Sequence, residues 1–159
     1  MATIAEDAKN ALDEFEKANT DLAGKAYLTS GDRSISEQID IIFDPKRADN
    51  YTQIKERFKS KYILTALPAR ADLNAEQLAW WEVEVKAQAG LPTGFAHVGG
   101  KAQDISVKNL DTAAKTKLKE KLEAKNISIY MEKVTGTTSE YGVSTEQANV
   151  FHVYYTKAP

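Results

Sequence analysis

Apolar residues near the start of the chain recur at alternating steps of four and three, a spacing that places them on one face of an α-helix. They are Ile4, Ala8, Ala11, Phe15, Ala18 and Leu22. This pattern predicts an amphipathic helix over residues 1–24, followed by a single domain over residues 25–159. The apolar face is expected to pack on that domain, although it could also bind a partner.

The pattern of residues 25–61 predicts one strand and two helices. Residues 26–29 are short and apolar, which is typical of a strand. Residues 34–43 predict a helix that ends at Asp44, because a residue that precedes proline avoids the helical conformation. Apolar side chains recur on one side of residues 51–61, which predicts a further helix.

Another helix is predicted from the cap residue Asn74 to Ala89. It contains the adjacent residues Trp80 and Trp81. Successive helical side chains point about 100° apart, so the two indoles do not share one narrow face. They indicate either a wide packed face or an aromatic wall beside a cleft.

The C-terminal half alternates strand-like and helix-like segments. Its predicted elements are a loop over 91–100, a strand over 104–107, a helix over 111–125, a strand over 127–134, a loop over 136–142 and a strand over 149–156. Because side chains alternate between the two faces of a strand, Asp104 lies on one face with Ser106, and His152 lies on one face with Tyr154. These elements predict an α+β fold in which a small antiparallel sheet is flanked by helices.

Composition indicates one ordinary globular domain. The chain has 159 residues, of which 42% are hydrophobic and 28% charged, and its net charge is -2. The lysine-rich run 115–119 is broken by nearby glutamates, so it is expected to form a solvated helix face. Nucleic acid is therefore not an expected partner.

Several classes of site and location are excluded or disfavoured by the residues that the chain lacks. Without cysteine, disulfides, thiolate catalysis and cysteine-bound zinc are excluded. No stretch approaches the roughly 20 apolar residues of a membrane span. The first ten residues mix alanine with charged residues and lack the apolar centre of a signal peptide, so we expect synthesis in the cytoplasm.

Candidate metal chemistry centres on the two histidines of the chain, His97 and His152, together with Asp104. Two imidazoles and a carboxylate fill three positions around a metal and leave one for water, which is what a catalytic zinc needs. A histidine can equally be a hydrogen-bonded structural residue. Manganese and cobalt also bind mixed nitrogen and oxygen sites.

The spacing around these residues resembles that of a known enzyme family. Residues 97–104 read H-x-x-G-x-A-x-D, residues 30–38 are similar to an S-G-x-R-S-x-x-x-Q segment, and His152 lies in a strand-like run near the end. These pieces, in this order, resemble the zinc D,D-carboxypeptidases and endopeptidases that trim bacterial cell walls. That family includes the VanY-like enzymes and is related to the hedgehog signalling domain.

The resemblance implies roles for individual residues. His97, Asp104 and His152 would bind Zn²⁺. Arg33 would bind a substrate carboxylate, for which its planar fork is suited. By the same resemblance, Gln38 would orient the substrate or Arg33, and Ser30 would stabilise the turn or contact the substrate.

The general base is where this sequence departs from the family. Many relatives carry Glu or Asp three positions before the late histidine, and this chain has Asn149 there. Glu146 is the expected substitute, with Glu140, or no base at all, as alternatives. Tyr154 is a candidate phenolic donor to a developing oxyanion.

These features predict a zinc metallopeptidase that hydrolyses peptide bonds of peptidoglycan stem peptides, as a D,D-carboxypeptidase or an endopeptidase. Without a signal peptide, delivery to the cell wall would be by a phage holin, by assembly into a phage or injection-type particle, or by another non-classical route. One alternative is a catalytically degenerate, zinc-binding module that binds peptidoglycan or has a structural role in such a particle. Another is a plain α+β scaffold without metal.

Overall fold

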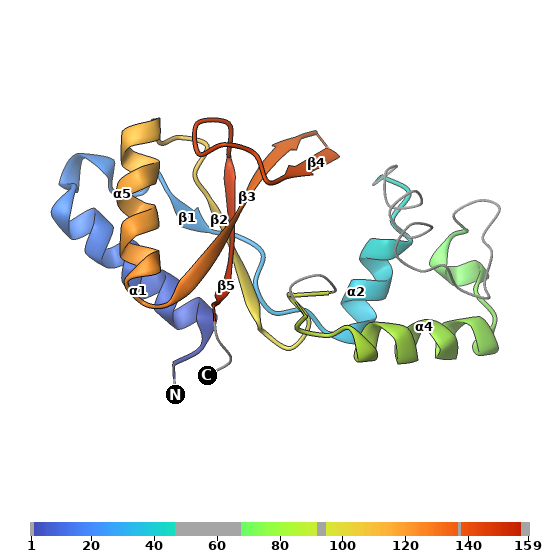
Figure 1. Ribbon diagram of the computed structural model, residues 1–159. Helices are drawn as coiled ribbons and strands as arrows, with labels where there is room; N and C mark the ends of the chain where they lie inside the picture. Colours follow the sequence, from blue (N-terminus) through green and yellow to red (C-terminus); the bar gives the residue numbers. More distant parts are fainter. Residues whose placement is uncertain (1, 47–67, 92–94, 137, 157–159) are drawn as a thin grey trace.

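A five-stranded antiparallel sheet with the strand order β1-β2-β5-β3-β4 lies at the centre of the fold (Figure 1). The computed structural model describes residues 2–46, 68–91, 95–136 and 138–156. The strands are β1 (Tyr27–Leu28), β2 (Ala102–Ser106), β3 (Ile127–Thr135), β4 (Thr138–Tyr141) and β5 (Val150–Tyr155). The α-helices of the described residues are α1 (Ile4–Ala18), α2 (Ile35–Ile42), α4 (Ala75–Ala87) and α5 (Thr112–Glu123), and the 3₁₀ turns are η1 (Thr20–Leu22) and η2 (Arg70–Asp72).

Helices α1 and α5 pack beside each other on one face of the sheet (Figure 1). Their apolar side chains share a core with the strands, in which Phe15, Leu118 and Phe151 are fully buried. We call α1, α5 and the five strands the sheet region. Within it, Phe151 and Val153 of β5 point into the core, so His152 between them points to the opposite face.

Helices α2 and α4 pack on each other away from the sheet and form a second, smaller core (Figure 1). Trp81 is buried there, with its ring edge-on to Phe43 at 5.4 Å and to Trp80 at 4.8 Å. Phe95 and Val98, from the loop before β2, belong to the same core. We call α2, α4 and residues 95–100 the helical region. Trp80 packs partly buried against this core, so the tryptophan pair forms a wide packed face.

The predicted fold class is confirmed, because helices flank an antiparallel sheet. The predicted cap at Asn74 is confirmed: its side chain accepts a hydrogen bond from the third helical N–H and completes a reciprocal capping box, and Ser34 caps α2 in the same way. Such caps depend only on neighbours in the chain, which is why the sequence predicts them well. The helix predicted over residues 51–61 lies outside the described residues.

Two boundaries differ from the prediction. Helix α1 ends at Ala18, not near residue 24, because the Asn19 side chain donates to the Phe15 carbonyl at 2.9 Å and replaces the next helical hydrogen bond. Residues 136–142 were predicted to be a loop, but most of them form β4, which pairs with β3. Its polar residues show no hydrophobic alternation because β4 lies at the sheet edge.

Within the described ranges, no helix combines the length and apolar character that crossing a membrane requires.

Candidate metal centre

Asp104 and His152 lie directly opposite each other on the neighbouring strands β2 and β5. Directly opposed residues of an antiparallel pair project on the same face. The flanking residues Ile105 and Phe151 are fully buried in the core on the other side, so strand alternation sends Asp104 and His152 to the face away from α1 and α5. Strand alternation lets the sequence predict which residues share the face of Asp104 and of His152. The register of β2 and β5 then shows that Asp104 and His152 are directly paired.

His97 reaches the same point from the loop between α4 and β2. Its backbone carbonyl accepts hydrogen bonds from the Arg33 and Gly100 N–H groups, both at 3.1 Å. Gly100 has a φ of +70°, a conformation that favours glycine, which explains why the turn after His97 carries one. The imidazole Nδ1 donates to the Gly31 carbonyl at 3.0 Å. The ring orientation is therefore determined by its partners in the chain.

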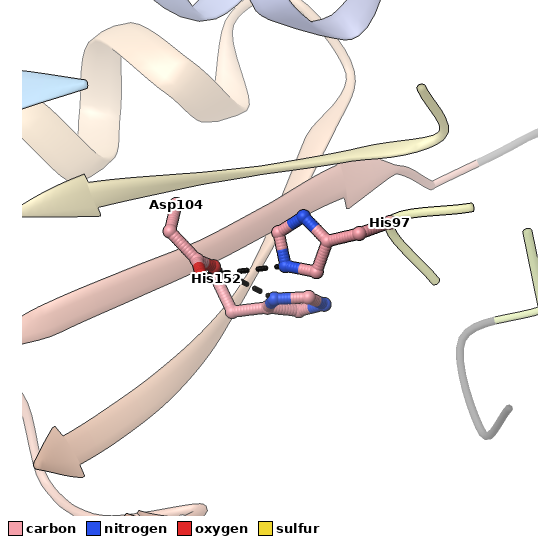
Figure 2. A group of neighbouring side chains, drawn as sticks. All are labelled: His97, Asp104 and His152. Atoms are coloured by element: carbon pink, nitrogen blue, oxygen red, sulfur yellow. Dashed lines mark hydrogen bonds and ion pairs between the residues drawn. The ribbon is translucent and has the colours of Figure 1, made fainter. Parts of the chain in front are cut away.

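The three side chains converge, as Figure 2 shows. Asp104 Oδ1 lies 2.9 Å from His152 Nδ1, and Asp104 Oδ2 lies 3.3 Å from His97 Nε2. The two imidazole rings are 4.9 Å apart at 69°. Each residue offers one ligand atom, and these three atoms all lie within 4.8 Å of one another. All three side chains are at most 15% exposed.

Burial alone would raise the pKa of Asp104, because an ionised carboxylate loses its hydration. Hydrogen bonds to His152 and His97, with the attraction of both imidazoles, outweigh this and lower the pKa from 3.8 to about 2. Asp104 is therefore an anion throughout the physiological range, which is the form that binds a metal.

The donor arrangement fits a bound cation. Since Nδ1 of His97 donates to Gly31, a neutral His97 presents the lone pair of Nε2 to a carboxylate oxygen 3.3 Å away. Two lone pairs that face each other need a proton or a metal ion between them. Two ligands of a tetrahedral zinc, each about 2.0 Å from the ion, are about 3.3 Å apart. The His97, Asp104 and His152 cluster could hold a metal ion.

The segment around Arg33 lies beside this cluster. The Ser30 carbonyl accepts from the Asp104 N–H at 2.8 Å, while Gly31 contacts His97 as described. A Cβ on Gly31 would lie 2.7 Å from the Gln103 side-chain oxygen, so any larger residue at this position would have to displace the Gln103 side chain. The two sequence motifs thus contact each other in the fold, through residues 66 positions apart in the case of Gly31 and His97.

The predicted substrate-binding residues occupy this neighbourhood in different states of burial. Arg33 is half-buried, Gln38 is buried and Ser30 is exposed. The Gln38 side-chain oxygen lies 3.5 Å from Nη1 of Arg33. The Arg33 and Gln38 side chains are therefore adjacent, as the predicted role of Gln38 in orienting Arg33 requires. Tyr154 lies next to the cluster, with its ring centre 6.1 Å from that of His152.

Glu146, the predicted general base, is not brought to the cluster. It is exposed between β4 and β5, and its main-chain carbonyl accepts from Nζ of Lys115 at 3.0 Å. Lys115 lies on α5, which covers the opposite face of the sheet. The lysine was predicted on a solvated face but is buried, because this hydrogen bond satisfies its charged end.

Asn149, at the position where relatives carry the base, is engaged with the backbone of β3. Its side chain accepts from the Val134 N–H and donates to the Val134 carbonyl, both at 2.7 Å. The amide thereby continues the pairing of β3 and β5 on the N-terminal side of the first residue of β5, Val150. This double hydrogen bond needs both a donor and an acceptor, which a carboxylate would not supply.

Glu132 on β3 was missed by the sequence-based reasoning. It is only 6% exposed. Burial raises its pKa, a hydrogen bond with Ser139 opposes this, the charge on Asp104 raises it further, and His152 and His97 lower it. The sequence signal was an acidic residue within a predicted strand, but its significance depended on which strand lay beside β3.

Comparison with protein-family models, with curated proteins and with solved structures finds no match for this chain. The geometry of the cluster and the motif resemblance therefore carry the functional argument.

Proposed function

We propose that this protein is a zinc-dependent metallopeptidase that hydrolyses peptide bonds in the stem peptides of bacterial peptidoglycan. The observation that carries the proposal is the convergence of His97, Asp104 and His152, with facing lone pairs 3.3 Å apart. The resemblance of residues 30–38 and 97–104 to the cell-wall peptidases supplies the substrate class. Zn²⁺ is preferred over other ions because two imidazoles and one carboxylate are typical of catalytic zinc.

His97 through Nε2, His152 and Asp104 would hold the ion. A zinc ion there would polarise the scissile carbonyl and lower the pKa of a bound water toward about 7. The Gly31 carbonyl orients His97 by accepting from Nδ1, as outer partners of zinc-bound histidines commonly do. The buried position of the cluster keeps competing water from the reacting atoms.

Arg33 would hold a carboxylate of the substrate, and Gln38 would orient the guanidinium through the contact at Nη1. Peptidoglycan stems carry both terminal and side-chain carboxylates, so this role suits D,D-carboxypeptidase and endopeptidase action equally. Tyr154, whose ring centre lies 6.1 Å from that of His152, would donate a hydrogen bond to a developing oxyanion. Delivery by a phage holin or within a phage or injection-type particle remains part of the proposal.

The decisive experiment combines metal analysis with hydrolysis. Purified protein is expected to contain one zinc per chain, and metal-replete protein should release peptide products from purified muropeptides. Both zinc and products should be lost in His97→Ala and after chelation. Protein that contains no divalent metal, or metal-replete protein that leaves muropeptides unchanged across a range of pH, would refute the proposal.

The degenerate zinc-binding module is favoured by the positions of Glu146 and Asn149, neither of which supplies a carboxylate to the cluster. Such a module should retain zinc and bind insoluble peptidoglycan without releasing products.

A further inference from the structure

The proposed metal centre needs a carboxylate beside the attacking water. The face of the sheet away from α1 and α5 contains one. Glu132 of β3 lies directly opposite Val150 of β5. Val150 is two residues before His152, so the side chains of Glu132, Val150 and His152 project on the same face. A diagonal neighbour of this kind is about 7–8 Å away between backbones, within reach of a long side chain.

The burial of Glu132 is unusual for its surroundings. Tyr130, its neighbour on the same face of β3, is 47% exposed, whereas Glu132 is 6% exposed. No ion pair of the described residues includes Glu132, and its hydrogen-bond partner is the neutral Ser139. A carboxylate buried without a cation is costly to stability. Such a residue is typical of a site that needs a carboxylate for chemistry.

The groups whose charges act on Glu132 are Asp104, His152 and His97, the three members of the cluster. Its backbone is also tied to the position that lacks the usual base, since the Glu132 carbonyl accepts from the Asn149 N–H at 3.0 Å. The Asn149 side chain in turn makes both of its hydrogen bonds to the backbone of Val134, two residues further along β3. The adjacent strand therefore carries a carboxylate on the same face as His152, whereas position 149 has none.

We propose that Glu132 is the general base of the proposed peptidase, in place of Glu146. This inference rests on the proposed function. One oxygen of the Glu132 carboxylate accepts a proton from the attacking water as the water oxygen bonds to the scissile carbonyl carbon. The same proton then passes to the leaving nitrogen as the carbon–nitrogen bond breaks. The products are a carboxylic acid and an amine, and Glu132 is again ionised.

The raised pKa of Glu132 suits this cycle. A carboxyl group whose anion is destabilised by burial holds a proton more firmly than an exposed one. It is therefore a stronger base toward water and remains able to return the proton near neutral pH.

The test compares Glu132→Gln with Glu140→Gln. Glu140, the alternative base considered from the sequence, is exposed on β4 and pairs with Lys133, which projects on the opposite face from Glu132; the strand pairing therefore separates it from the cluster, and it has no part in the proposed site. Both variants remove one negative charge from the same hairpin. Glu132→Gln should bind zinc with unchanged stoichiometry but lower kcat on muropeptides by about 100-fold or more, with KM little changed. Glu140→Gln should behave as wild type.

A second readout does not need hydrolysis. Cobalt-substituted protein has a visible spectrum that changes with pH, and the midpoint of that change should shift by about one unit or more in Glu132→Gln because a nearby charge is lost. Glu140→Gln should leave the midpoint in place. If Glu132→Gln folds poorly, Glu132→Asp keeps the charge but shortens the side chain, and kcat should again fall.

The outcomes separate the two proposals. Wild-type protein that binds cobalt, shows the Glu132-dependent midpoint and cleaves no muropeptide would refute the peptidase and leave Glu132 at the metal centre. An active enzyme whose kcat and cobalt midpoint are unchanged in Glu132→Gln would overturn the role of Glu132 alone. An active enzyme that loses kcat in Glu146→Gln instead would return the role to Glu146. Protein that binds no metal would overturn both.

Discussion

The sheet region and the helical region contribute to the candidate metal centre in different ways. Among the described residues, the sheet-region core contains sixteen buried apolar residues and the helical-region core seven. Asp104 and His152 are placed by the β2–β5 ladder over the larger core. His97 is placed by loop hydrogen bonds and by Phe95 and Val98, which belong to the smaller core.

This difference indicates that the two regions carry different properties of the protein. The sheet region supplies most of the buried apolar surface, which dominates folding free energy. The helical region supplies His97, the third candidate ligand, without which the cluster has only two. A bound metal would therefore connect the two regions through His97.

Identical substitutions in the two cores test this division most directly. Phe151→Ala in the sheet region should lower the free energy of unfolding by about 3–5 kcal/mol, because it leaves a cavity in the larger core. Phe95→Ala, two residues from His97, should lower zinc affinity by about 10-fold or more by releasing the loop. Urea unfolding and zinc titration measure the two effects. If zinc affinity falls in neither variant, the role given to the smaller core is contradicted.

Metal addition tests the connection between the regions. Zinc at a thousandfold excess over its Kd should raise the free energy of unfolding by about 4 kcal/mol, since it binds the folded state alone. The increase should disappear in His97→Ala and in His152→Ala and persist in Glu146→Gln. Thermal unfolding with and without a chelator measures it. An undiminished increase in His97→Ala would show that metal binds elsewhere.

Acid unfolding of the metal-free protein tests the smallest of these effects. The pKa of Asp104 is lowered from 3.8 to about 2 on folding, so its stabilisation is complete above pH 3.8 and is lost as pH falls through about 2. The difference between the two pKa values corresponds to about 2 kcal/mol. Urea midpoints between pH 5 and pH 2 should show this loss in wild type and not in Asp104→Asn. Asp21→Asn, which is exposed on η1, should retain it.

Local features of the fold were predictable from the sequence to the extent that their causes are local. The capping boxes at Ser34 and Asn74 involve residues three apart, and the alternation of β5 follows from residues within one strand. β4 was not predictable in this way. Its polar residues become a strand only because the edge of β3 is available for pairing, and no pattern within residues 136–142 records that.

The residues of the candidate site also differ in how far the sequence alone predicts them. His97, Asp104 and His152 were predictable because ligand chemistry limits the choice to few residue types and the chain has only two histidines. Glu132, which we propose as the general base, was not predictable, because the chain contains many acidic residues. Spacing from His152 favoured Glu146, yet spacing along the chain does not say that its carbonyl bonds to α5.

The sequence by itself determined the capped helices, the face of each predicted strand and the residue types available to bind a metal. The tertiary structure alone decided that β3 lies beside β5, that Asn149 is occupied with Val134 and that Glu132 faces the cluster. The physical reason is that periodicity and capping act between residues a few positions apart. The pairing of β5 with β3 and β2 joins segments some 20 to 50 residues apart, and its outcome depends on how the whole chain buries its apolar surface.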